Sequence, residues 1–106
     1  EEGLVDWTQP PMHIQNRVRG LYPWPHAYTY LHGERLILMR THLEPGPSSE
    51  LPGTIVDLAG GLLHVATGDS GLLAIEELQP EGRRAMKTRD YLAGHPIQPG
   101  ARFSRR

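Results

Sequence analysis

The apolar positions near the start of the chain repeat at helical spacing. Ile14 and Val18 are four residues apart and Pro11 lies three residues before Ile14, so one apolar stripe would face a core. Thr8 precedes two prolines, which are tolerated in a first helical turn because the backbone N–H groups there have no helical partner. This pattern predicts an amphipathic helix over about residues 9–19, capped by Thr8 and ended by Gly20.

The segment after this helix is rich in proline. Pro23 and Pro25 bracket Trp24 and restrict the backbone on each side of it, which predicts a rigid, extended connector over residues 21–26. We expect Trp24 to be a packing residue, so that its truncation to alanine would cost about 3 kcal/mol or more of stability.

From residue 27 onward the apolar period changes to two, which is typical of strands. Residues 27–31 and 35–43 read as an antiparallel hairpin closed by a tight turn at His32-Gly33, and residues 44–52 form a loop. Three more strands are predicted over residues 54–58, 62–67 and 72–78. They are separated by glycines at 60–61 and 68–71 that suit turns with positive φ.

The end of the chain predicts a second helix and a loose tail. Thr88 would cap a helix over residues 89–93 that ends at Gly94, and the basic tail from Ser104 should be frayed. Five short strands leave open edges unless the sheet curls. The fold class predicted is therefore mainly β, a small five-stranded barrel of the oligonucleotide-binding type with an N-terminal helix and a short C-terminal helix.

Length and composition agree with one domain over residues 1–106. The chain is 38% hydrophobic, with 12 Gly, 10 Pro and no Cys, so neither a disulfide nor a thiolate metal site can hold it. No apolar run approaches the roughly 20 residues that cross a bilayer, and the acidic pair Glu1 and Glu2 is unlike the basic start of a signal peptide. We expect a soluble, cytoplasmic protein with no membrane contact, acting as a monomer.

Charge is distributed unevenly along the chain. Residues 1–82 hold four Arg against eleven acidic residues, a charge of −7, whereas residues 83–106 hold six Arg and one Lys against Asp90 alone, a charge of +6. Two groups of basic residues are candidate contacts for RNA phosphates, one on the first helix and one ahead of the last: Arg17 and Arg19, and Arg83, Arg84, Lys87 and Arg89. The plain alternative is a solvated charged face.

Other chemistry finds little support in the sequence. The six His residues show no helical spacing that would pair two of them as metal ligands, and no Ser stands in the setting of a nucleophile. Glu76 and Glu77 are adjacent on a strand and should point to opposite faces. We predict no catalytic residue and no metal site. Trp7, Trp24 and Tyr28 are expected to fill a core rather than to stack on bases.

Two blocks of sequence resemble a known family. The first is QPPMHIQNRVRGLYPWPHAYTY at residues 9–30, in which Ile14, Asn16, the Arg19-Gly20 pair and the segment from Pro23 to Ala27 match the start of the C-terminal domain of formyltransferases. His26 departs from this pattern, where a small residue is usual. The second block is ELQPEGRRAM at residues 77–86, followed by Asp90, Leu92, Gly94 and the closing Pro99-Gly100-x-Arg102-Phe103. It is similar to the branch of the family that acts on methionyl-tRNA.

This resemblance implies a function for a longer protein. Such domains help to hold initiator tRNA while a preceding catalytic domain, absent from this chain, transfers a formyl group from 10-formyltetrahydrofolate. The chain alone should then be inactive and hold no cofactor. Two alternatives stay open: a structural C-terminal domain of a sugar or folate formyltransferase, and a free-standing oligonucleotide-binding module.

Overall fold

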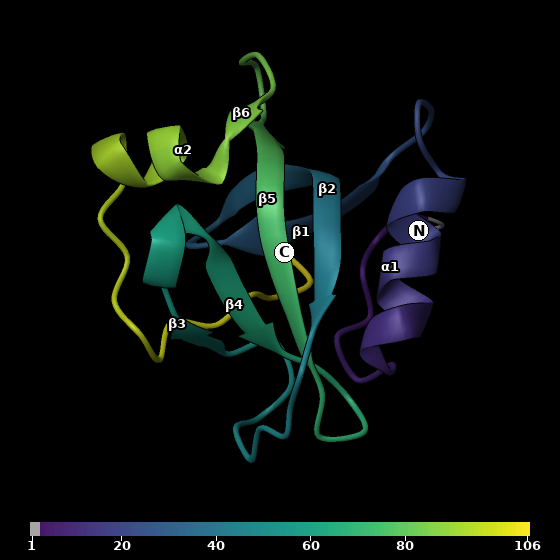
Figure 1. The fold of residues 1–106 in the computed structure, drawn as a ribbon. Helices are drawn as coiled ribbons and strands as arrows, with labels where there is room; N and C mark the ends of the chain where they lie inside the picture. Colours follow the sequence, from purple (N-terminus) through teal and green to yellow (C-terminus); the bar gives the residue numbers. More distant parts are fainter. Residues whose placement is uncertain (1–2) are drawn as a thin grey trace.

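A computed structural model describes residues 3–106, so Glu1 and Glu2 lie outside the described part. The predicted helices and strands all occur, and one short strand is added near the C-terminal helix (Figure 1). In chain order the elements are α1 (Pro11–Gly20), β1 (Ala27–Leu31), β2 (Glu34–Glu44), β3 (Ile55–Asp57), the 3-10 helix η1 (Ala59–Gly61), β4 (Leu63–Ala66), β5 (Leu72–Pro80), β6 (Met86–Lys87) and α2 (Thr88–Gly94). Within residues 3–106, no helix has the length and apolar character needed to cross a membrane.

The strands form one curled antiparallel sheet. Its order is β1-β2-β5-β4-β3, and β6 pairs with β5 beyond that path. The sheet bends into a half-barrel, with α1 beside one part of its wall and α2 beside another (Figure 1). The predicted fold class, mainly β with a barrel-like sheet and two flanking helices, is confirmed.

The C-terminal segment spans the gap between the two edge strands. Ser104 and Tyr30 of β1 exchange backbone hydrogen bonds of 2.9 and 3.3 Å. On the other side, the Ile55 N–H of β3 donates to the Ala101 carbonyl at 2.8 Å, and the Phe103 N–H donates to Gly53 at 2.9 Å. The expectation that the tail frays was therefore wrong at Ser104, because both edges of the sheet offer unpaired groups that the segment up to this residue satisfies.

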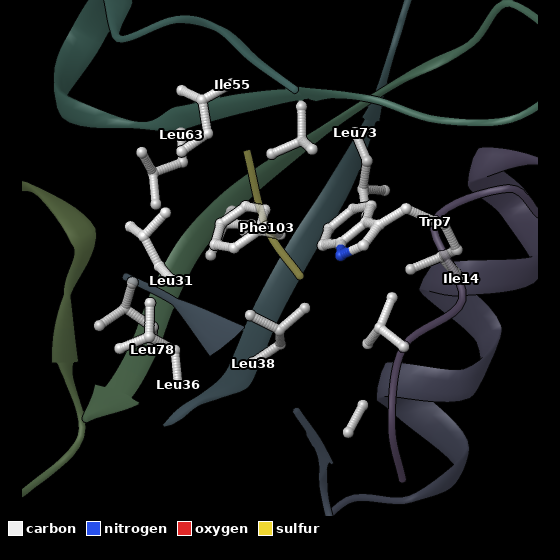
Figure 2. Close-up of a cluster of buried hydrophobic side chains, with 14 of the residues drawn as sticks. Trp7, Ile14, Leu31, Leu36, Leu38, Ile55, Leu63, Leu73, Leu78 and Phe103 are labelled. Atoms are coloured by element: carbon white, nitrogen blue, oxygen red, sulfur yellow. The ribbon is translucent and has the colours of Figure 1, made fainter. Parts of the chain in front are cut away.

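One hydrophobic core fills the concave side of the sheet. At its centre the rings of Trp7 and Phe103 stack with centroids 5.2 Å apart (Figure 2). The indole N–H of Trp7 donates to the hydroxyl of Thr29 at 3.0 Å, so the one polar atom of the ring is paired although both side chains are buried. The core placement predicted for Trp7 and Tyr28 is confirmed, since both are buried.

Helix α1 packs against this core as its apolar stripe predicted. Ile14 and Val18 are each 2% exposed. The helix nevertheless begins after Pro10 and has no side-chain cap. Thr8 was wrongly predicted as the cap, because its hydroxyl and its backbone N–H both donate to the carboxylate of Asp6, two residues earlier. The hydrogen bond from the Thr8 hydroxyl, and after it the bond from the Thr8 backbone, lower the pKa of Asp6.

Gly68 and Gly71 were predicted to allow a turn with positive φ, but the structure requires glycine at these positions for close packing. Gly60 and Gly61 have φ of 69° and 77°, as expected, but between β4 and β5 the positive φ values fall on Asp69 and Ser70. A Cβ at Gly68 would lie 1.7 Å from the Thr8 carbonyl oxygen, and one at Gly71 would lie 2.6 Å from the ring of Pro11. These two glycines therefore make room for the start of α1 rather than for a turn.

The connector over residues 21–26 is a compact series of turns, not an extended strut. The His26 N–H donates to the Leu21 carbonyl at 2.8 Å, which folds the segment back on itself, and His26 has φ of 78°. Trp24 is 82% exposed, so the prediction that it packs was wrong. The prolines fix local dihedral angles, but the chain reversal between α1 and β1 aims the indole at solvent.

The short helix α2 also begins differently from the prediction. Its N-cap is Lys87, while Thr88 is buried and donates its hydroxyl to the Ile75 carbonyl of β5 at 2.9 Å. Tyr91 donates to the Glu34 carboxylate at 2.9 Å and stacks on His95. Burial, then this hydrogen bond, raises the pKa of Tyr91. The hydroxyl of Thr88 thus ties α2 to the sheet instead of capping it.

Candidate nucleic-acid interface

The hairpin between β5 and β6 carries two of the predicted basic contacts at its tip. Arg83 and Arg84 are exposed, and the hairpin projects beyond the sheet at the top of Figure 1. The backbone of the tip is fixed, since the Arg83 N–H donates to the Pro80 carbonyl at 3.0 Å and the Gln79 amide donates to the Arg83 carbonyl at 2.8 Å. Two guanidinium groups therefore stand on a bonded turn, open to solvent.

Lys87 and Arg89 lie at the base of the same hairpin. Lys87 is opposite Glu77 in the β5–β6 register, and both basic side chains are exposed. Arg89 lies against η1, where a Cβ at Gly61 would come within 3.0 Å of the Arg89 Cβ, so the glycine leaves space for the arginine stem. Lys87 and Arg89 border an open hollow of about 220 Å³ together with Glu76 and Glu77.

The two arginines of α1 are divided between two sides of the helix. Arg17 and Arg19 are both exposed in its last turn, where a positive charge suits the helix dipole. Arg19 borders a hollow of about 510 Å³ that reaches Arg40 and the same two carboxylates, Glu76 and Glu77. Arg17 instead borders hollows near His13. The fold thus brings Arg19, Lys87 and Arg89 around one pair of glutamates, and leaves Arg17 elsewhere.

Glu76 and Glu77 lie on the same side of the sheet, contrary to the prediction of opposite faces. The register between β2 and β5 shifts twice, and the second shift leaves Glu76 as an extra residue on β5. Such a bulge rotates the strand locally and breaks the alternation of faces. Glu77 lies 3.9 Å from the Nε of Arg40, and Glu76 bonds His42 at 2.6 Å. Both carboxylates therefore have local partners.

A histidine-glutamate network continues from this point across the outer face of the sheet. Glu44 lies 3.8 Å from His42 and also binds Nδ1 of His64, while Nε2 of His64 lies 2.8 Å from the Ala59 carbonyl of η1. Burial opposes the charged ring, but the hydrogen bonds to Glu44 and Ala59 prevail and raise the pKa of His64. Among residues 3–106, no three His, Asp or Glu side chains are placed to hold a metal ion.

Sequence reasoning missed two features of this surface. Arg40 faces the same hollow as Arg19 but stands alone in a strand, so no cluster marked it. The His42, Glu44 and His64 network joins residues on different strands, and only the register of His42 and His64 opposite Ala74 would have found it.

Comparison with known proteins adds a family and several relatives. A family model described as "Formyl transferase, C-terminal domain" matches residues 1–96. The methionyl-tRNA formyltransferase of Geobacter sulfurreducens is 45% identical over 103 residues, which cover 97% of this chain and 32% of that protein. The enzyme of the same name from Bacillus velezensis is 38% identical over 100 residues, covering 94% of this chain and 32% of that protein. This chain therefore spans about a third of the length of these curated relatives.

Solved structures show the same fold at lower identity. A variant of HypX from Aquifex aeolicus superposes with a TM-score of 0.72 at 19% identity, over 93% of this chain and 18% of that one. HypX in complex with tetrahydrofolic acid gives 0.69 at 16% identity, over 100% of this chain and 21% of that one. At this identity the likeness is one of architecture.

Proposed function

This chain belongs to the formyl transferase C-terminal domain family, and from that premise we propose that it is the tRNA-binding domain of a methionyl-tRNA formyltransferase. The full-length enzyme would transfer a formyl group from 10-formyltetrahydrofolate to the methionyl group of initiator tRNA. The relatives that carry this name and cover nearly all of the chain favour the tRNA branch over the sugar and folate branches.

One observation carries the RNA-binding part of this proposal. Arg83, Arg84, Lys87 and Arg89 are all exposed on and around one bonded hairpin, and Arg19 lies across the adjoining hollow. Phosphate contacts by Arg and Lys fix the position of an RNA without reading its sequence. The domain would hold the tRNA body in place, and selection of the initiator would rest on the catalytic domain.

The formyl donor is assigned to the catalytic domain rather than to this chain. The hollows around Glu76 and Glu77 are open and bordered by charged side chains. A pterin ring is usually held in a concave and mostly apolar pocket. The charged residues that border these hollows do not fit it. Part of HypX has this fold, and HypX has been solved in complex with tetrahydrofolic acid. That complex supports the proposal that a longer protein containing this domain uses folate.

The test measures the binding of tRNA to the chain as a function of salt. If each neutralised phosphate releases counterions, log K falls linearly with log salt, by about 0.7 to 0.9 per contact. Replacing Arg83, Arg84, Lys87 and Arg89 by Ser should weaken binding, flatten the salt dependence and leave the thermal midpoint unchanged, because these side chains are exposed.

A matched pair of double variants separates position from net charge. Arg83→Ser with Arg84→Ser removes two adjacent exposed arginines from the hairpin, and Arg105→Ser with Arg106→Ser removes two from the tail. The hairpin pair should weaken tRNA binding by more than the tail pair at equal net charge. Equal losses would show that the hairpin is not the RNA face, and a folded chain that binds no tRNA would favour the structural-domain alternative.

A further inference from the structure

The exposed side chain of Trp24 is not accounted for by the phosphate-binding surface. It is 82% exposed, and Tyr22, two residues earlier in the same turn, is 53% exposed. The core is complete without it, because Trp7 and Phe103 already fill the centre of the sheet. Trp24 therefore faces solvent outside the core, and Tyr22 beside it is only half covered.

The turn that carries Trp24 is held to the end of α1. The Leu21 N–H donates to the Arg17 carbonyl at 3.0 Å, and the His26 N–H donates to the Leu21 carbonyl at 2.8 Å. The rings of Tyr22 and His26 meet edge to face at 5.4 Å. Pro23 and Pro25 restrict the backbone on either side of the indole. The ring is thus presented by a turn that gives up little further freedom on binding.

The chain segment around this turn carries basic and no acidic side chains, and the nearest carboxylates on the adjoining hollow, Glu76 and Glu77, come from β5. Residues 7–33 contain no Asp or Glu, and they contain Arg17 and Arg19 in the last turn of α1, immediately before the aromatic turn. The turn itself therefore brings no carboxylate to repel phosphate. Single-stranded nucleic acid binds where basic side chains hold the backbone and aromatic faces hold the bases, because every base has a π-face.

We infer that Trp24 is a stacking platform for an unpaired nucleobase of the bound RNA, next to phosphates held by the end of α1. The site takes an unpaired base from a loop or bulge, since a base inside a duplex is already stacked on both faces. This inference rests on the proposed function and adds an aromatic contact to its basic one. The alternative partner for an exposed indole is an apolar protein surface. Such a surface would bind by burying the ring, and it would not require an aromatic face at this position.

Three substitutions at Trp24 separate these occupants, with unacylated tRNA as the probe. Trp24→Ala and Trp24→Leu should each weaken binding by about fivefold to a hundredfold, the range that base stacking supplies. Trp24→Phe should retain most of the affinity because it keeps an aromatic face. The slope of log K against log salt should stay at the wild-type value in all three, since the indole has no charge. Thermal midpoints serve as the folding control.

Tryptophan fluorescence reports the contact directly. The chain has two Trp, of which Trp7 is buried and Trp24 is exposed, so iodide should quench mainly Trp24 in the free protein. Binding of tRNA should quench the emission of Trp24 and protect it from iodide, whereas the Trp24→Phe variant should show no change. A blunt RNA duplex has no unpaired base, and Trp24→Ala should bind it as the wild type does.

The possible failures are distinguishable. Wild-type affinity for tRNA in Trp24→Ala, with the hairpin double variant still weakened, would overturn the stacking role and leave the proposed function standing. Wild-type affinity in Trp24→Leu would identify a plain apolar contact and also overturn stacking. Absence of tRNA binding by the wild-type chain would overturn the proposed function and this inference together.

Discussion

The two tryptophans of this chain occupy opposite environments, although prolines stand near both. Trp7 is 7% exposed, stacks on a residue from the far end of the chain and pairs its N–H with Thr29. Trp24 is 82% exposed on a turn whose own hydrogen bonds are local. The difference shows that residues distant in sequence decide whether an aromatic side chain of this protein is buried or exposed. Phe103 and Thr29 make Trp7 a core residue, whereas none of residues 3–106 covers the ring of Trp24 in this way.

The largest expected effect on stability comes from removing the buried indole of Trp7. Trp7→Ala should lower the free energy of unfolding by about 3 to 5 kcal/mol, because it leaves a cavity against Phe103 and deprives the Thr29 hydroxyl of its partner. Urea denaturation followed by circular dichroism measures this loss. A loss below about 1 kcal/mol would mean that the stack between Trp7 and Phe103 does not organise the core.

The next effect concerns the segment that carries Trp7. A Cβ at Gly68 would lie 1.7 Å from the Thr8 carbonyl oxygen, and a backbone atom cannot move aside as a side chain can. Gly68→Ala should therefore destabilise the fold by about 2 to 3 kcal/mol. Gly20→Ala is the control, since nothing lies within 4 Å of its Cβ position and alanine favours the helix. Equal stabilities of the two variants would contradict this packing.

The exposure of His64 lies between the exposures of the two tryptophans, since its side chain is 13% exposed. Its pKa is raised above the ordinary value of 6.5, so the stabilisation it supplies is present below pH 6.5 and is lost as the pH rises through the folded pKa. His64→Gln should cost about 1 kcal/mol in acid, the scale of a net hydrogen bond, and less in alkali. Unfolding free energies measured from pH 5 to 9 would contradict this if the gap between variant and wild type widened with pH.

The smallest expected effect on stability comes from removing the exposed indole of Trp24. Trp24→Ala should change the free energy of unfolding by less than about 0.5 kcal/mol, as surface substitutions usually do. Thermal denaturation beside Trp7→Ala gives the direct contrast. A loss of several kcal/mol would mean that the turn over residues 21–26 packs in solution in a way that the structure does not show, and the stacking role would fail with it.

The elements that sequence predicted well are those fixed by neighbouring residues. His32 and Gly33 take φ of 51° and 82°, the turn that a two-residue hairpin requires, and β1 and β2 follow from it. The apolar stripe of Ile14 and Val18 likewise placed α1. The barrel-like sheet followed from five short strands that needed their edges satisfied.

The errors share a different cause. Thr8 and Thr88 have the right chemistry for helix caps, but Asp6 and the Ile75 carbonyl bind their hydroxyls instead. Glu76 changed faces because of a bulge that only the pairing with β2 reveals. The candidate RNA face was partly predictable, since the basic residues at 83–89 are close in sequence, whereas the approach of Arg19 to them depends on how α1 packs.

The C-terminal segment over residues 100–104, which bonds both edge strands, affects how the protein folds during synthesis. A ribosome supplies the chain from its N-terminus, and Trp7 emerges first but finds its ring partner only when Phe103 has been synthesised. Until then the edges of β1 and β3 lack the backbone partners that Ser104 and Ala101 provide. Contacts between residues so far apart in sequence are also those that form slowly. Within this domain, the nascent chain should therefore carry these exposed strand edges from the synthesis of β1 and β3 until residues 101–104 follow, and a chaperone acting in this interval would protect it from aggregation.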